Sequence, residues 1–317
     1  MSVATPVEVA VFTAERCLEH RVPAGFPERP ERLRRIVDHL RGRGFRVADV
    51  EPAGDDWREA VLSVHDPEYV ERFQRAVDRG DGLLDSADNP LSPGTWAAAV
   101  AAVETTLQAC DWVAGGERRR GFAAVRPPGH HAERDLAMGF CFFNNAAIAA
   151  ERLRRRHGAA RVAVFDFDVH HGNGTQHLFE GRPDVLYASV HHYPFYPGTG
   201  AATESGHDEG RGATLNVPLP AGSGDDAYAR AFERVLPAIE EYRPDALVLS
   251  AGFDAYAGDP LGGMRMTAAG YRECGAVLGQ LADRLCRGRA LSVLEGGYDL
   301  EALPALVEAY LIGLAGQ

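Results

Sequence analysis

Apolar runs and amphipathic segments alternate along this chain of 317 residues from end to end. Several of the apolar runs are continuous, which is typical of strands covered on both faces of a parallel sheet. The segments between them carry helix start and stop signals, such as Asp66-Pro67 before one segment and Gly80-Asp81-Gly82 after it. This alternation predicts an α/β fold, a parallel sheet with helices on both faces, and we assign residues 1–317 to one domain.

The expected elements can be placed on the chain. The strands are predicted at Val7–Thr13, Phe45–Val50, Phe122–Arg126, Val162–Asp168, Val185–Val190, Ala246–Ala251 and Leu291–Leu294. The helices are predicted at Pro30–Leu40, from Pro67 to just before Gly80, and at Thr95–Val113, Asn145–Arg156, Asp226–Glu241, Ala268–Arg287 and Glu301–Leu314. Ligands of such sheets bind beyond the carboxyl ends of the strands, so polar residues that follow a strand are the candidates for a site.

The amino-acid composition indicates which binding partners and which cellular compartment to expect. Acidic residues outnumber basic ones by 45 to 33, giving a net charge of −12, which disfavours nucleic acid and suits a cationic substrate. The five cysteines are scattered and odd in number, as expected in a reducing compartment. We find no signal-peptide pattern and no apolar run of ~18 residues, so we expect a cytoplasmic, bacterial-type protein with no membrane span.

The segment Asp166–Gly174 contains the densest group of residues that could bind a metal ion. Alternation along a strand would align Asp166, Asp168 and His170 on one face. Asp254, which follows another apolar run, lies where a neighbouring strand would bring a further ligand. Two carboxylates and one imidazole leave an open position on a tetrahedral metal, as in catalytic zinc sites. The alternative for Asp166, Asp168 and His170 is an ordinary strand end, with capping aspartates and a structural histidine. The alternative for Asp254 is a helix cap or a loop residue.

Two further motifs follow predicted strands. His130 and His131 come after a Pro-Pro-Gly turn, where one imidazole could act as a base on water and the other lie near a developing oxyanion. Tyr298 follows Glu295-Gly296-Gly297, and its phenol could donate a hydrogen bond to that oxyanion. Taken alone, these residues could equally be surface histidines after a turn and a packed tyrosine.

A series of motifs then carries a resemblance over nearly the whole chain. In order they are His65-Asp66-Pro67 with Tyr69-Val70, Arg126–His131, Gly139–Asn144, Asp166–Gly174, Pro197–Gly200, Asn216–Pro218, Asp254 with Asp259-Pro260, and Glu295–Tyr298. Together they resemble the zinc-dependent histone deacetylase family, as a bacterial, class II-like member. The resemblance implies the arginase–deacetylase fold, with about eight parallel strands.

The resemblance also implies one zinc ion per chain. Its ligands would be Asp168, His170 and Asp254. His131 would act as general base and then general acid, His130 as its electrostatic partner, and Tyr298 would polarise the acyl carbonyl. Fe(II) is left open as the metal used in the cell.

Residues around this centre are implied in the same way. Asp166 would orient His130, and Asn173 would be the partner of His131. Class I enzymes of the family have Asp at the position of Asn173, so a less basic His131 is expected. A potassium site is expected at Asp166, Ser189 and the backbone oxygens of Asp168 and His170.

For the substrate, the resemblance implies a narrow tunnel. Its walls would be Phe140 and Tyr196, where Tyr replaces the more usual Phe and makes the wall more polar. The remaining assignments are Gly139 beside the tunnel, Asp88 at its rim as an acceptor for substrate backbone, Leu261 at the gatekeeper position, and Arg32 in an acetate cavity. For Arg32 the alternative is a solvated helix face.

The expected activity is removal of acetyl or other acyl groups from lysine side chains of proteins or peptides, releasing a carboxylate and a free amine. An acetylpolyamine substrate is the alternative; Leu261, in place of an acidic gatekeeper, favours acyl-lysine. Less favoured are a non-catalytic acyl-lysine binder and an arginase-like enzyme with two manganese ions, for which Ala255-Tyr256 supply no second set of ligands. Oligomeric state is left open.

Overall fold

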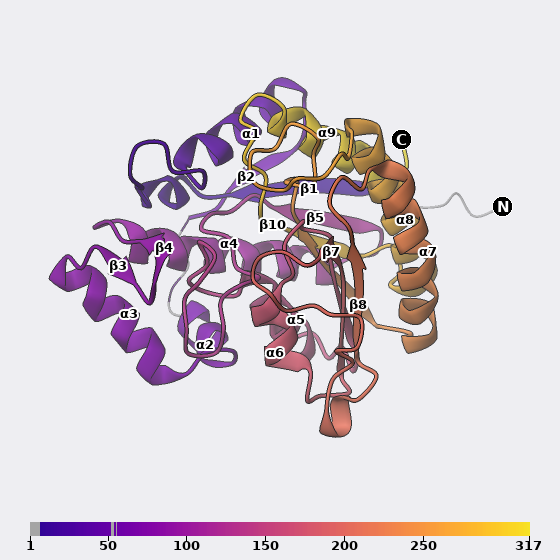
Figure 1. Cartoon of the computed structure of the whole chain (residues 1–317), viewed down its shortest axis with the longest axis horizontal. Coiled ribbons are helices and arrows are strands. Elements are labelled where there is room, and N and C mark those ends of the chain that lie inside the picture. Colours follow the sequence, from indigo (N-terminus) through magenta and orange to yellow (C-terminus); the bar gives the residue numbers. More distant parts are fainter. Residues whose placement is uncertain (1–6, 52–53, 55) are drawn as a thin grey trace.

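The computed structural model describes residues 7–51, 54 and 56–317, so residues 1–6 of the predicted domain lie outside the described part. Its strands are β1 (Glu8–Thr13), β2 (Val47–Asp49), β5 (Arg119–Ala123), β6 (Val162–Asp166), β7 (Val185–His192), β8 (Thr214–Leu219), β9 (Ala246–Ala251) and β10 (Ala290–Leu294). Within these described residues the eight strands form one sheet in the order β2-β1-β5-β10-β9-β6-β7-β8. In Figure 1, β2 and β1 lie toward one end of this sheet and β7 and β8 toward the other. Every neighbouring pair is parallel, which confirms the predicted α/β fold.

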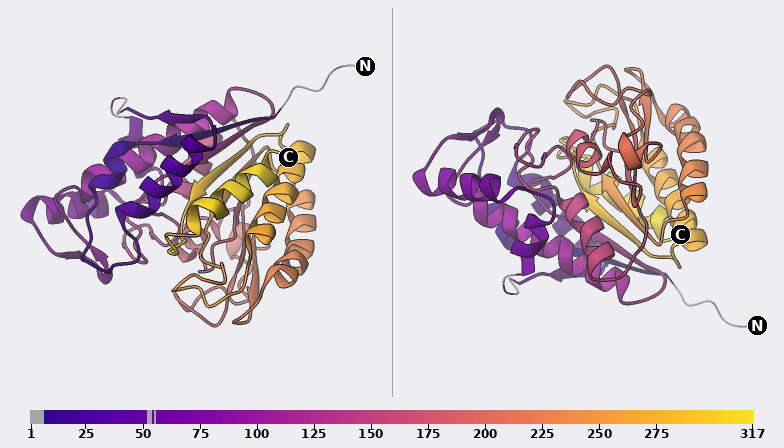
Figure 2. Two further views of the ribbon diagram at one scale, coloured as in Figure 1. Left: turned by 90° about the horizontal axis from the view of Figure 1, so that it is seen from above. Right: turned by 90° about the horizontal axis from the view of Figure 1, so that it is seen from below.

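Helices cover both faces of the sheet (Figure 2). They are α1 (Pro30–Gly42), α2 (Asp56–Leu62), α3 (Pro67–Arg79), α4 (Thr95–Ala114), α5 (Asn145–Arg155), α6 (Asn173–Phe179), α7 (Asp225–Tyr242), α8 (Ala268–Leu285) and α9 (Leu303–Leu314). α1, α9, α8 and α7 lie on one face, and α4, α5 and α6 lie on the other. The alanine-rich α4 is buried on most of its circumference because it packs between the sheet and the outer helices α2 and α3.

Several predicted bounds were wrong at the carboxyl ends of strands. β5 ends at Ala123 rather than Arg126, and β6 ends at Asp166 rather than Asp168. After Asp166 the backbone N–H of Asp168 donates to the Asp166 carboxylate, and the N–H of His170 donates to that of Asp168. These local bonds replace the ladder of a strand, so the alternation argument does not describe how the three side chains are aligned.

The sequence analysis also missed elements. It did not predict β8, α2, α6 or the antiparallel hairpin of β3 (Leu83–Leu84) and β4 (Ser86–Pro90). In β8, Asn216 and Pro218 interrupt the apolar pattern, and α2 and α6 have seven residues each, too few for a clear helical period. In the described part of the chain, no helix combines the length and the apolar character needed to cross a membrane.

Candidate active site

The loops after β6 and β9 bring together the three predicted metal ligands. Nδ1 of His170 lies 3.3 Å from Oδ1 of Asp168 and 3.2 Å from Oδ2 of Asp254. All three side chains are buried, and their ligand atoms lie within 4.8 Å of one another. Each loop leaves the carboxyl edge of the parallel sheet, which is why residues so far apart in sequence meet.

The two carboxylates of this cluster favour the binding of a cation. Burial, and then the nearby carboxylate of Asp168, raise the pKa of Asp254. Burial alone would lower the pKa of His170, but its hydrogen bonds to Asp168 and Asp254 raise it to about 9. A bound cation would replace the proton on His170 as the positive partner of these two buried carboxylates, and the donor set of two oxygens and one nitrogen fits zinc or Fe(II).

Backbone groups hold both carboxylates in place. The N–H of Gly296 donates to Oδ2 of Asp168 at 2.7 Å, and the N–H of Val169 donates to Oδ1 of Asp254 at 3.0 Å. A Cβ at position 296 would lie 2.1 Å from Oδ2 of Asp254, so only glycine fits there. The sequence suggested that this glycine is needed for a tight turn. The structure adds a second reason, because the backbone at position 296 lies close to the carboxylates of the candidate metal ligands.

His131 is held in one tautomer. Its Nδ1 lies 2.7 Å from Oδ1 of Asn173, whose amide nitrogen donates to Glu133. Because a carboxylate only accepts, the amide oxygen of Asn173 must face His131, so Nδ1 carries the proton and Nε2 is left as the base. Burial, and then the neighbouring His130 and His170, lower the pKa of His131 well below its usual value, so it is neutral near pH 7.

His130 differs from His131 because its pKa is raised. Its Nδ1 donates to Oδ2 of Asp166 at 3.0 Å. Burial opposes its protonation, but the carboxylates of Asp168 and Asp166 raise its pKa to about 10. The sequence analysis named Glu295 only as part of a motif and gave it no role. Its Oε2 accepts from the backbone N–H groups of Gly129 and His130 and so fixes this turn.

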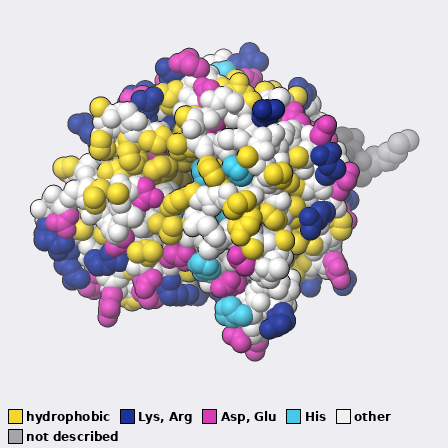
Figure 3. Space-filling model, viewed as in Figure 1, with side chains coloured by type: hydrophobic (Ala, Val, Ile, Leu, Met, Phe, Trp, Pro, Cys, Tyr) yellow, Lys and Arg dark blue, Asp and Glu magenta, His cyan; other side chains and the backbone are white. Residues whose placement is uncertain are grey.

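Two of the residues predicted to line a tunnel lie beside candidate catalytic side chains. The ring of Tyr196 lies 5.2 Å from that of His131, and the ring of Phe140 lies 5.8 Å from that of Tyr298. Burial raises the pKa of Tyr298 well above its usual value, which keeps its hydroxyl a donor. In the space-filling view, apolar side chains and histidines gather around a hollow on this face (Figure 3).

Comparison with known sequences places this arrangement in a family. The sequence model of the histone deacetylase domain matches residues 26–314. The chain belongs to the histone deacetylase family. It is 43% identical over 299 residues to a histone deacetylase-like amidohydrolase of Pseudomonas aeruginosa, covering 92% of this chain and 78% of that one.

Two solved structures of the family share the fold. The HDA15 HD domain matches with a TM-score of 0.87 and 40% identity, over 98% of this chain and 90% of that one. An acetylpolyamine aminohydrolase from Burkholderia pseudomallei matches with a TM-score of 0.85 and 34% identity, over 96% and 98%. The names of these relatives thus include both a histone deacetylase-like amidohydrolase and an acetylpolyamine aminohydrolase.

The structure contradicts the alternative interpretation of Arg32 as a residue on a solvated helix face. Arg32 is 1% exposed, and its guanidinium donates to the backbone oxygens of Glu295 and Gly297 and to the carboxylate of Glu28. The guanidinium carbon also lies 4.7 Å from the centre of the Tyr298 ring. Arg32 therefore supports the loop that carries Tyr298, and its place in an acetate cavity stays a prediction.

Leu261, the predicted gatekeeper, lies in the turn after Asp259. Its N–H donates to Oδ1 of Asp259, whose Oδ2 accepts from the N–H of Tyr298. This turn is therefore tied to the backbone of the candidate catalytic tyrosine, and Leu261 itself is half-buried.

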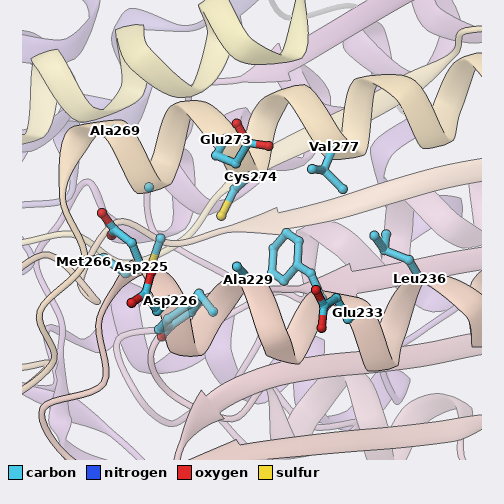
Figure 4. Close-up of a pocket in the computed structure, with 13 residues that line it drawn as sticks. Asp225, Asp226, Ala229, Glu233, Leu236, Met266, Ala269, Glu273, Cys274 and Val277 are labelled. Atoms are coloured by element: carbon cyan, nitrogen blue, oxygen red, sulfur yellow. The ribbon is translucent and has the colours of Figure 1, made fainter.

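A separate cavity of about 460 Å³ lies between α7 and α8 (Figure 4). Apolar side chains such as Leu236 and Val277 line it, with Asp226, Glu233 and Glu273 at its edges. None of the predicted site residues lines this cavity, so it is distinct from the metal cluster.

Substituting Gly139 by alanine is expected to abolish most of the activity without unfolding this family member. Gly139 has φ of 58°, and a Cβ there would lie 2.2 Å from Cδ2 of His131. The imidazole would have to move, and a displacement of 1 Å costs about 100-fold in rate. Steady-state kinetics and far-UV circular dichroism would check this; unchanged kcat would show that His131 has room to spare.

Proposed function

We propose that this chain is a zinc-dependent deacylase that hydrolyses the amide between an acyl group and the side chain of lysine in proteins or peptides. The observation that carries the proposal is the meeting of the Asp168, His170 and Asp254 cluster with a neutral His131 and with Tyr298 at one end of an aromatic-walled approach. Residues 1–317 would form one catalytic domain, of class II-like character because of Asn173.

The chemistry follows from the side chains. Zinc held by the three ligands would supply Lewis acidity to the amide carbonyl and to water. His131 takes the proton of the attacking water at Nε2, while Asn173 holds its Nδ1–H. Tyr298 donates to the oxygen that gains charge, and His131 then returns its proton to the leaving amine. A carboxylate and a free amine result.

Two further parts of the proposal concern a monovalent cation and the cellular compartment. A potassium ion is proposed near Asp166 because β6 and β7 pair with Asp166 opposite Ser189. The backbone oxygens of Asp168 and His170 are the further ligands that the resemblance implies. The cytoplasm is proposed from the five free cysteines.

An acetylpolyamine is the second candidate substrate. The likeness to an acetylpolyamine aminohydrolase favours it, and a net charge of −12 suits a polycation. Leu261 carries no charge to bind a second ammonium group, and this favours acyl-lysine.

Turnover of two substrates in parallel tests the proposal. Zinc-loaded protein is expected to hydrolyse an acetyl-lysine peptide, and chelation of the metal should abolish turnover until zinc is restored. N-acetylputrescine is the second substrate, and His131→Ala is the control for contaminating activity. Hydrolysis of N-acetylputrescine alone would move the protein to the polyamine class, and no hydrolysis of either by zinc-loaded protein would contradict the deacetylase proposal.

A further inference from the structure

The carboxylate of Glu133 lies behind the candidate base, one side chain further away than Asn173. Nδ1 of His131 donates to Oδ1 of Asn173 at 2.7 Å, and Nδ2 of Asn173 donates to Oε1 of Glu133. A neutral amide thus stands between an imidazole and a carboxylate and is hydrogen-bonded to both. Asn173 is 2% exposed and the side chain of Glu133 is 17% exposed, so these bonds are largely shielded from solvent, where hydrogen bonds in a chain polarise one another.

The nitrogen side of the Asn173 amide faces acceptors only. Besides Oε1 of Glu133, Nδ2 lies 3.3 Å from the sulfur of Met138 and 3.4 Å from the backbone oxygen of His131. Sulfur is a weak acceptor and 3.4 Å is long for an N–H···O bond, so Glu133 is the strong partner. A reversed amide would place its oxygen against the carboxylate, and Glu133 therefore opposes that reversal.

The backbone of Glu133 is held on both sides. Its N–H donates to the backbone oxygen of Leu136 at 2.9 Å, and its backbone oxygen accepts from Nδ1 of His65 at 2.8 Å. Nε2 of His65 accepts from the N–H of Asn144 at 2.9 Å, and burial lowers the pKa of His65 to about 4, so this ring stays neutral near pH 7. The motif that begins at His65 therefore anchors the loop that carries Glu133.

A surface histidine holds the side chain of Glu133 from the outer side. His177 lies four residues after Asn173 on α6, so both project from the same face of this helix. Nδ1 of His177 donates to the same Oε1 of Glu133 at 2.8 Å, and its side chain is 40% exposed. This hydrogen bond raises the pKa of His177 against the opposing effect of burial, and Glu180 and Glu204 raise it further. Because a carboxylate only accepts, Nδ1 carries a proton in the neutral ring and in the cation alike, and Oε1 stays an acceptor for Asn173 in both.

We propose that Glu133 is a positioning residue, which acts through the amide of Asn173 to keep the proton of neutral His131 on Nδ1 and to stabilise the imidazolium that forms during the reaction. The proposal rests on the proposed function, since it concerns the base of that reaction. Asn173 carries no charge, and Glu133 supplies one from the next side chain along. Glu133 lies on the Nδ1 side of His131, so its loss should act on kcat and leave KM nearly unchanged.

The test moves the charge between the two side chains as well as removing it. Glu133→Gln removes the charge, and kcat should fall about 10-fold, because a hydrogen bond to a charged group outweighs a neutral one by about that factor. Glu133→Gln combined with Asn173→Asp puts a carboxylate directly against Nδ1 of His131, with a glutamine amide that donates to it. This double variant should return kcat to within about 3-fold of wild type, and KM should stay within about 2-fold in both variants.

The matched control is Glu180→Gln, which removes a carboxylate that also faces His177 but has no contact with Asn173 among those described. It should leave kcat and KM unchanged. A wild-type kcat in Glu133→Gln would overturn the proposal. A double variant no faster than Glu133→Gln would overturn it too, because a purely structural role of Glu133 is not rescued by moving its charge.

The tautomer of His131 gives a readout without turnover. Nitrogen NMR of zinc-loaded protein, isotope-labelled at its histidines, distinguishes a proton on Nδ1 from one on Nε2, and His131→Ala identifies the signal. Wild type should show the Nδ1–H form alone. Glu133→Gln should show a mixture, because a glutamine can turn either end of its amide toward Asn173. If zinc-loaded wild type hydrolyses nothing, the proposed function fails, and a His131 tautomer that is the same in wild type and Glu133→Gln would then overturn the role of Glu133 by itself.

Discussion

Replacing His131 by alanine is expected to lower kcat by about 10²- to 10⁴-fold and to change KM by only a few-fold. A positioned general base contributes a factor of that size, and His131 is the imidazole with a free Nε2 beside the metal cluster. Its hydrogen bond to Asn173 and its lowered pKa keep it neutral, so it can accept a proton near pH 7. Tyr298→Phe should cost about 10²-fold, because one donor to the oxyanion is lost.

The measurement is steady-state hydrolysis of the better of the two substrates by zinc-loaded variants. Zinc content is determined in parallel, so that loss of metal is not mistaken for loss of the base. His39→Ala is the matched control, because His39 lies on α1 and pairs with Glu308 away from the site. If His131→Ala retained more than a tenth of wild-type kcat with zinc bound, another group would have to be the base.

The order of motifs in the sequence was enough to predict the fold, and the structure brings three of the predicted site residues together. Asp168, His170 and Asp254 follow apolar runs, and parallel strands deliver such residues to one edge. The expected strand over 162–168 exists but ends at Asp166, because the carboxylates of Asp166 and Asp168 accept from backbone N–H groups and turn the chain.

Other features could not be read from the sequence. Glu28 and Glu133 carry no local pattern that marks them. Each acts through a partner distant in sequence, Arg126 for Glu28 and Asn173 for Glu133. The hydrogen bond between Tyr196 and Asp88 likewise joins residues that only the folded chain brings together. Side-chain pairs of this kind depend on packing, which periodicity and spacing do not specify.

Glu28 is the centre of a buried ion-pair network that the sequence analysis did not find. Both of its oxygens accept from Arg126, at 2.9 and 2.8 Å, and Oε1 also accepts from Arg32 at 3.0 Å. The three side chains are almost fully buried. Glu28→Gln should lower the free energy of unfolding by about 3–5 kcal/mol at pH 7, because two buried guanidinium groups lose their counter-charge.

The loss caused by Glu28→Gln should shrink at low pH. Burial alone would raise the pKa of Glu28, but Arg126 and then Arg32 lower it to about 2 in the folded protein, against 4.5 for an ordinary glutamate. The stability that comes from ionised Glu28 is therefore fully present above pH 4.5 and is lost as the pH falls toward 2. The neighbouring His20 has its pKa lowered to about 4 by burial, so it stays neutral between pH 5 and 7.

Urea unfolding of wild type and Glu28→Gln at pH 7, 5 and 3 measures this difference. The gap in free energy between the two proteins should be equal at pH 7 and 5, and smaller by about 2 kcal/mol at pH 3, from 1.5 pH units at 1.36 kcal/mol each. Glu31→Gln, at an exposed carboxylate in the first turn of α1, removes the same charge and should cost less than about 0.5 kcal/mol. A gap that stays constant down to pH 3 would mean that the cost of Glu28→Gln comes from packing, because a charge-based cost must fade when the carboxylate is protonated.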